Sequence, residues 1–176
     1  MARFYIVDQN GVEFGGHYQA YTACVVDGAR KLGLDPVVLA NKRARRMSGS
    51  GQPEILPCFT YGWSEAEVHG QLDWTEGNIA YEMFQAFGRL PPAVDDHVFI
   101  HTIGYRELAA LFACLTERLL PGDPIPNIHL LLRRDPDILI DNYEHYEQYF
   151  STLAASAYLR RKITLHTDTI LLSRAF

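Results

Sequence analysis

The chain has 176 residues, of which 48% are hydrophobic and 21% are charged, and its net charge is −5. This length accommodates one well-cored α/β domain but not two typical ones, and the composition excludes a chain that is disordered throughout. The negative charge argues against general nucleic-acid binding, and no apolar run approaches the roughly 20 residues of a membrane span.

The cysteines and histidines indicate neither a redox motif nor a metal site. Cys24, Cys58 and Cys114 lie in apolar runs without C-x-x-C spacing, so we expect reduced thiols within the core. The histidines lack paired spacing such as H-E-x-x-H, and we expect no metal and no cofactor. With no recognisable signal peptide, the protein is expected to be cytoplasmic, with peripheral contact at the inner face of the membrane left open.

The first predicted unit is a strand, a glycine turn and a helix. Residues 3–8 are β-branched and aromatic, as in a buried strand. Helical periodicity begins at His17 and ends at Gly33, and a second buried strand follows over residues 35–40. This order predicts a right-handed βαβ unit. The predicted apolar face of the helix contains Tyr18, Tyr21, Ala23, Cys24, Val25, Ala29 and Leu32.

The glycine turn is the first candidate binding feature. Gly15 and Gly16 have no Cβ, so a ligand can approach their backbone, and the helix that starts at His17 offers unpaired N–H groups to an anion or polar oxygen. Alternatively, the glycines only close a tight turn. The spacing is not G-x-G-x-x-G, and no acidic residue follows the second strand to hold a ribose, so a nicotinamide enzyme is not expected.

A cationic run follows the second strand and precedes a stretch rich in glycine, serine and proline. It consists of Lys42, Arg43, Arg45 and Arg46. We expect a mobile loop that either contacts anionic lipid or a phosphorylated acceptor, or is solvated and has no partner. Residues 54–59 are predicted as a third strand, in which Pro57 indicates an edge or irregular position.

The second half of the chain continues the alternation of helices and strands. Residues 60–77 are predicted as a loop or broken helix. The predicted helices span residues 78–88, 106–120 and 143–157, and the predicted strands span residues 95–102, 127–132 and 162–167. Asp168 is positioned to cap a last helix that begins at Thr169.

This alternation predicts a single domain with a doubly wound, mainly parallel sheet in a Rossmann-like three-layer α/β/α arrangement. In the common 3-2-1-4-5 strand order, a crevice opens where the first and fourth strands end. The order would place the glycine turn opposite the end of the fourth strand, with the ends of the fifth and sixth strands along the same edge. The residues concerned are Gly15, Gly16, His17, His101, Thr102, Gly104, Arg133, His166 and Asp168. The alternative is that these histidines are structural and that the polar strand ends are those of any parallel sheet.

Three motifs resemble those of a known family. They are Gly15-Gly16-His17-Tyr18 followed by a helix and Gly33-Leu34-Asp35-Pro36-Val37-Val38-Leu39, the strand Asp96-His97-Val98-Phe99-Ile100-His101, and His166-Thr167-Asp168-Thr169. With them the chain resembles the N-terminal, acceptor-side domain of a GT-B-fold glycosyltransferase of the retaining, glycogen-synthase-like superfamily. The resemblance spans most of the chain.

The resemblance implies a transferase that moves a sugar from a nucleotide-sugar to a glycan or lipid-linked acceptor. His101 would be catalytic, and the substrate-binding residues would be Gly15, Gly16, His17, Tyr18, Thr102, Gly104, Arg133, His166 and Asp168. In the family a C-terminal domain binds the donor; it is expected to be missing from this chain, which would then be inactive alone. The second hypothesis is a stand-alone Rossmann-like binding or regulatory module without transferase activity.

Overall fold

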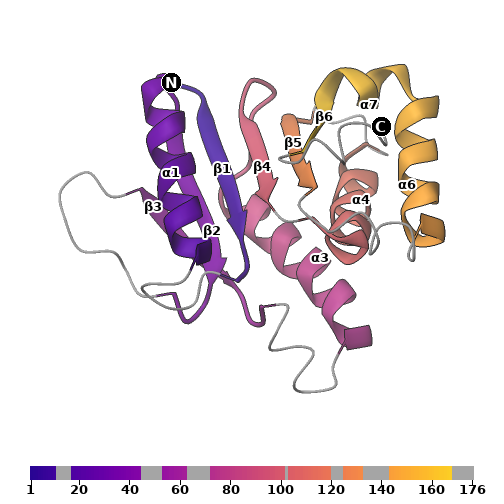
Figure 1. Cartoon of the computed structure of the whole chain (residues 1–176), viewed down its shortest axis with the longest axis horizontal. Helices are drawn as coiled ribbons and strands as arrows, with labels where there is room; N and C mark the ends of the chain where they lie inside the picture. The colour runs from indigo at the N-terminus through magenta and orange to yellow at the C-terminus, as the bar shows by residue number, and fades with distance from the viewer. Residues whose placement is uncertain are drawn as a thin grey trace.

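Six parallel strands form the central layer of the protein, in the order β3-β2-β1-β4-β5-β6 (Figure 1). The computed structural model describes residues 1–10, 17–44, 53–62, 72–101, 103–119, 125–132 and 143–167. The strands are β1 (Arg3–Asp8), β2 (Asp35–Asn41), β3 (Glu54–Phe59), β4 (His97–His101), β5 (Asn127–Leu132) and β6 (Ile163–Thr167). The described helices are α1 (His17–Lys31), α3 (Leu72–Arg89), α4 (Tyr105–Leu119), α6 (Tyr143–Ala155) and α7 (Ala157–Lys162).

Alternating residues along each strand build two separate cores, one on each face of the sheet. In β1, Tyr5 and Val7 belong to the larger core, which contains buried residues of α3, α4 and α6. Ile6 belongs to the smaller core, with Val26 of α1 and Val38 of β2. The result is the predicted single-domain, Rossmann-like α/β/α arrangement. Among the described helices, none is both long and apolar enough to cross a bilayer.

The predicted neighbours of the central strand are confirmed. β1 pairs in parallel with β2 on one side and with β4 on the other, so the sheet grows outward from β1 in both directions. The sixth strand extends this order beside β5. Pro57 lies in the edge strand β3, as predicted, and the β2–β3 register shifts between Ala40 and Asn41, opposite that part of β3.

Several element boundaries differ from the prediction. α3 begins at Leu72, because Gly77 is accommodated inside the helix instead of stopping it. β4 begins only at His97, since the Asp96 carboxylate accepts hydrogen bonds from the backbone amides of Arg3 and Ala93, both at 2.7 Å. The helix predicted over residues 143–157 ends at Ala155, and the short helix α7, which was not predicted, follows it. The Ser156 hydroxyl caps α7 by accepting the Leu159 N–H. The predicted last helix, residues 169–176, lies outside the described residues.

The buried face of α1 also differs from the prediction. Thr22, Val26 and Ala29, spaced by four and three residues, are buried, whereas Leu32 is 78% exposed. Cys24 is exposed on this helix, so the prediction of three core thiols is wrong at that position. Cys58 and Cys114 are buried as expected, and burial raises the pKa of Cys58 to about 12.

Gly33 ends α1 in the left-handed backbone conformation, with φ of +74°. The Gly33 N–H donates to the Arg30 carbonyl at 2.9 Å, and the Leu34 N–H donates to the Ala29 carbonyl at 3.0 Å. These two bonds form a Schellman motif and satisfy carbonyls at the helix end. The turn then brings the chain into β2.

Adding the same methyl group to two glycines of this segment should have opposite effects on stability. Gly33→Ala should lower the free energy of unfolding by about 1 kcal/mol, because a Cβ is strained at its positive φ. Gly28→Ala should raise it by about 0.5–1 kcal/mol, because Gly28 lies inside α1 and no atom lies within 4 Å of the added carbon. Urea unfolding of the two variants measures both effects, and a shared sign would contradict the prediction.

Candidate functional site

The candidate site lies at the carboxyl edge of the sheet, where β1 and β4 run side by side. β1 ends at Asp8 and β4 at His101, while α1 and α4 begin at His17 and Tyr105. The chain leaves β1 toward β2 on one side, whereas β4 leads to β5 on the other. This is the topological switch point at which parallel α/β sheets bind ligands.

Buried polar side chains gather at this edge. Among the described residues, six of the seven buried polar or charged residues belong to it or to the helix turns beside it, and only Asp96 lies at the opposite edge. They are Asp8, Gln9, Thr22, Asn41, His101 and Glu107. Buried polar groups cost free energy unless they are paired, so their contacts define the chemistry of the edge.

Asp8 and His101 face each other across the two central strands. The His101 Nε2 atom lies 3.5 Å from Asp8 Oδ1, with the two side chains 2% and 4% exposed. The other carboxylate oxygen, Asp8 Oδ2, accepts a hydrogen bond of 2.6 Å from the Thr22 hydroxyl of α1. The Tyr21 ring packs against the imidazole, with centroids 5.2 Å apart. The contacts hold the carboxylate in place and bring the imidazole beside it.

Glu107 connects the end of β1 to the start of α4. Its carboxylate accepts hydrogen bonds from the Gln9 side-chain amide at 2.6 Å and from the Gly104 N–H at 2.9 Å. The second bond is half of a capping box, because Gly104 occupies the N-cap position and Glu107 the third residue of the helix. Glu107 thus holds the Gln9 side chain in a fixed position relative to the start of α4.

Two buried acceptor atoms remain without a hydrogen-bond donor among the described residues. They are Asp8 Oδ1 and Gln9 Oε1. The Gln9 amide cannot simply be reversed, since its nitrogen donates to the Glu107 carboxylate. Both residues line a cavity of about 10 Å³ together with His101 and Glu107. That volume accommodates a single water molecule or one inserted hydroxyl group.

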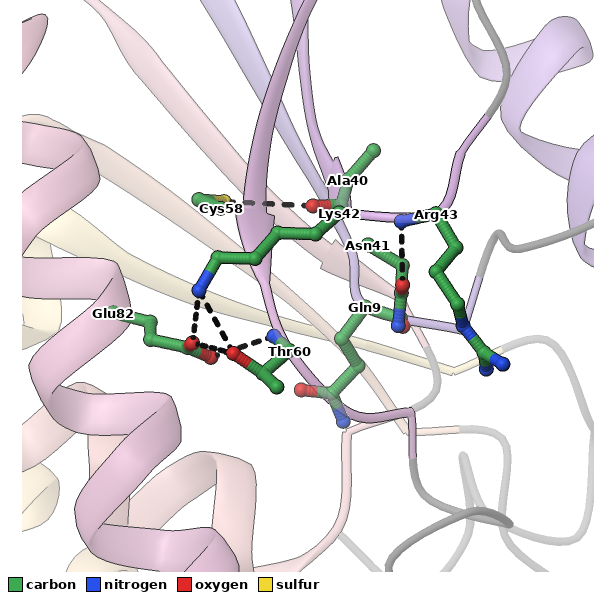
Figure 2. Close-up of polar contacts among 8 residues, drawn as sticks. All are labelled: Gln9, Ala40, Asn41, Lys42, Arg43, Cys58, Thr60 and Glu82. Atoms are coloured by element: carbon green, nitrogen blue, oxygen red, sulfur yellow. Dashed lines mark hydrogen bonds and ion pairs between the residues drawn. The ribbon is translucent and has the colours of Figure 1, made fainter.

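The basic run begins beside this site, and the structure gives its first residue an internal partner (Figure 2). Lys42 extends away from Arg43, and its Nζ donates to Glu82 Oε1 at 2.9 Å and to the Thr60 hydroxyl at 2.8 Å. Arg43 is exposed, and its N–H donates to Asn41 Oδ1 at 2.9 Å. Lys42 is therefore used in joining β2 to α3, which weakens its predicted role in membrane or phosphate contact.

Apart from Lys42, Arg43 and His166, the predicted site residues divide into those that the structure brings to this edge and those that it does not fully describe. His101 and Gly104 lie there, and α1 begins at His17, as expected. The backbones of His17 and Tyr18 are described, but their side chains lie outside the description. The remaining residues lie outside the described part of the chain: Gly15, Gly16, Arg45, Arg46, Thr102, Arg133 and Asp168.

His166 is the predicted residue that joins a different cluster. It lies on β6, two strands away from β4, and its imidazole is hydrogen-bonded to that of His129 at 3.1 Å. Its register partner Leu131 separates it from His101. The ends of parallel strands do share one edge, but two strand widths are too far for side chains to meet.

Five buried residues of the site were not among the predicted site residues: Asp8, Gln9, Thr22, Asn41 and Glu107. Two had signals in the sequence. Asp8 ends the first strand, and an acidic residue there faces the switch point. Glu107 comes three residues after Gly104, as a capping box requires. Thr22 lacked a signal, because only the packing of α1 on β1 brings its hydroxyl to Asp8.

Comparisons of the chain with family models, curated proteins and solved structures find no match. In the parts of the chain that the structure describes, no group of three or more histidine, cysteine or carboxylate side chains is arranged to hold a metal ion. The functional interpretation therefore depends on the contacts at the carboxyl edge.

Proposed function

We propose that the carboxyl edge of β1 and β4 binds a sugar hydroxyl, and that the chain is the acceptor-side domain of a glycosyltransferase. The observation that carries the proposal is the pair of buried acceptors Asp8 Oδ1 and Gln9 Oε1, which have no described donor and line one cavity with His101. A sugar hydroxyl would donate its one hydrogen to either of these two acceptors. Since the cavity has room for one hydroxyl, the sugar ring would lie across its mouth.

The role proposed for His101 follows from its contact with Asp8. A carboxylate beside an imidazole orients the ring. At 3.5 Å the Asp8–His101 contact is longer than a direct hydrogen bond. We propose that the imidazole hydrogen-bonds a sugar hydroxyl or stabilises charge on a departing phosphate. His101 would therefore touch the substrates, while Asp8 and Thr22 position it.

The rest of the proposal follows the family resemblance. The nucleotide-sugar donor would be bound by a C-terminal domain, and the acceptor would be a glycan or a lipid-linked sugar in the cytoplasm. The exposed side chain of Arg43, with Arg45 and Arg46, remains the proposed contact with an anionic membrane.

A binding experiment tests the proposal. The ¹⁵N-labelled chain is titrated with glucose, galactose, mannose and N-acetylglucosamine, and separately with UDP-glucose. We expect at least one sugar to shift amide signals next to Asp8 and His101 saturably, and His101→Gln to weaken that binding about five- to tenfold through the loss of one hydrogen bond. His97→Gln is the matched control, because His97 begins β4 and lies at the opposite end of that strand from His101.

The same titration separates the alternatives. Tight, micromolar binding of UDP-glucose at the site would contradict an acceptor role. Absence of any sugar-dependent shift would favour a stand-alone binding or regulatory module. The small volume of the cavity favours that second candidate, since a transferase must bring two substrates together.

A further inference from the structure

Three histidines on neighbouring strands form a diagonal series across the sheet face that carries Phe4. They are His97 on β4, His129 on β5 and His166 on β6, which we call the histidine row. The strand register explains the diagonal: His129 pairs with Phe99, two residues after His97, and His166 pairs with Leu131, two residues after His129. Residues two apart on a strand share a face, so all three rings project from the same side.

The rings meet end to end. His97 Nδ1 lies 3.0 Å from His129 Nε2, and His129 Nδ1 lies 3.1 Å from His166 Nε2. The ring centroids are 5.3 Å apart in both pairs, which exceeds the nitrogen separation as end-to-end rings require. The His97 and His129 planes differ by only 17°. In each contact, the two nitrogen atoms therefore point directly at each other, as in a hydrogen bond. In a metal chelate they would instead point at a common position occupied by the metal ion.

The hydrogen bonds limit how many protons the row can hold. Each of the two contacts needs one proton, on either facing nitrogen. Three neutral rings carry three protons, so one outer nitrogen is protonated and the other is not. One additional proton can bind to the unprotonated outer nitrogen, and both hydrogen bonds within the row are kept. A second additional proton would place two N–H groups face to face and two positive charges on the row.

We propose that the histidine row stores one excess proton and breaks when it must take a second, which makes the packing of β4, β5 and β6 sensitive to acid. A single excess charge can reside on any of the three rings, because shifting a proton within a contact moves the charge to the next ring. Uptake of a second proton removes one contact and adds repulsion between imidazolium groups.

Among the residues that the structure describes, an aromatic ring and polar groups that already have partners lie beside the row. Phe4 packs against the rings of His97 and His129, with centroids 6.1 and 6.4 Å away. The Asp96 carboxylate, next to His97 in the sequence, accepts two backbone N–H groups. The Lys162 amine donates to Val94 O and to Oδ1 of Asn127, the register partner of His97. Helix α1 covers the same face of the sheet over β1 and β2, where it contributes Val25 and Val26 to the smaller core.

Burial and the charges of the two neighbours lower the pKa of His129 to about 4. An unfolded chain returns this group to its ordinary value near 6.5. The unfolded state therefore binds more protons between these two values, and stability falls as the pH drops from about 6.5 to about 4. Because His129 is only half buried, we expect the unfolding equilibrium constant to rise by roughly ten- to a hundredfold from this residue.

Two measurements on the whole chain test the proposal. In the wild type with ¹⁵N-labelled histidine, NMR at pH 7.5 should detect couplings across both nitrogen–nitrogen contacts. Urea unfolding at pH 6.5 and pH 4 should show a larger loss of stability in the wild type than in His129→Gln, which cannot take up the proton. His145→Gln, a histidine outside the row, should keep the wild-type pH dependence.

The outcomes are distinct. Couplings within the row that vanish in acid, together with a reduced pH dependence in His129→Gln, support a one-proton row. Three rings that titrate independently near 6.5 without couplings would overturn it, and this result needs no variant to fold. Equal pH dependence in the wild type and His129→Gln would also overturn it.

Discussion

Leu130→Ala should lower the free energy of unfolding by about 3–5 kcal/mol. Leu130 lies on β5, is 0% exposed, and belongs to the core between the sheet and helices α3, α4 and α6. Removing three carbons leaves a cavity that β5 cannot close by shifting, because it is hydrogen-bonded to β4 on one side and to β6 on the other. Chemical denaturation, followed by circular dichroism, measures the change.

The adjacent strand supplies a matched control. Leu165 of β6 is the register partner of Leu130 but is 37% exposed. Leu165→Ala removes the same atoms from a site that water already reaches, and it should cost less than about 1.5 kcal/mol. Similar losses for the two variants would show that β6, and not the core under β5, governs stability at this end of the sheet.

Glu107→Ala should lower the free energy of unfolding by about 2–4 kcal/mol. The variant leaves two buried donors, the Gln9 amide and the Gly104 N–H, without the carboxylate that accepts both. Hydrogen bonds to a charged group contribute about 1.5–3 kcal/mol each, and the vacated space admits water that recovers part of the loss. The effect is measured by urea unfolding at pH 7.

Two further variants isolate the cause of that loss. Glu107→Gln keeps the shape and one acceptor oxygen, so its loss should be intermediate. Glu144→Ala removes a carboxylate from the first turn of α6 whose side chain is 83% exposed, and it should change stability by less than about 1 kcal/mol. If Glu107→Ala had a free energy of unfolding as high as that of Glu144→Ala, the capping box would not contribute to stability.

The strands and their order could be predicted because short stretches of the sequence identify each strand and helix. Apolar runs such as Tyr5-Ile6-Val7 identify the strands, and the helices between them require parallel pairing. The position of His101 at the switch point follows from that order. Boundaries were less predictable, since they depend on particular side-chain bonds such as that of Ser156.

The contacts of the site could not be predicted to the same degree. The Asp8–Thr22 hydrogen bond depends on the rotation of α1 about its own axis. Because any of three or four neighbouring helix residues could face the strand, the sequence does not determine which of them meets Asp8. The histidine row depends on the register of three strands, and the order of the strands in the sheet does not determine that register. A shift by one residue would turn His129 to the opposite face, and nothing near it in the sequence determines that choice.

The central position of β1 also has a consequence for the order in which the chain assembles. Asn41 reaches the Gln9 carbonyl across 32 residues, whereas the Arg3 amide reaches Asp96 across 93. Contacts across shorter stretches form sooner, and the N-terminal part of a chain leaves the ribosome first. β1 and β2 can therefore pair before β4 has been synthesised. Until β4 arrives, one side of β1 presents unpaired backbone groups and apolar side chains, so a nascent chain halted before β4 exposes a hydrophobic edge that chaperones or another chain can bind.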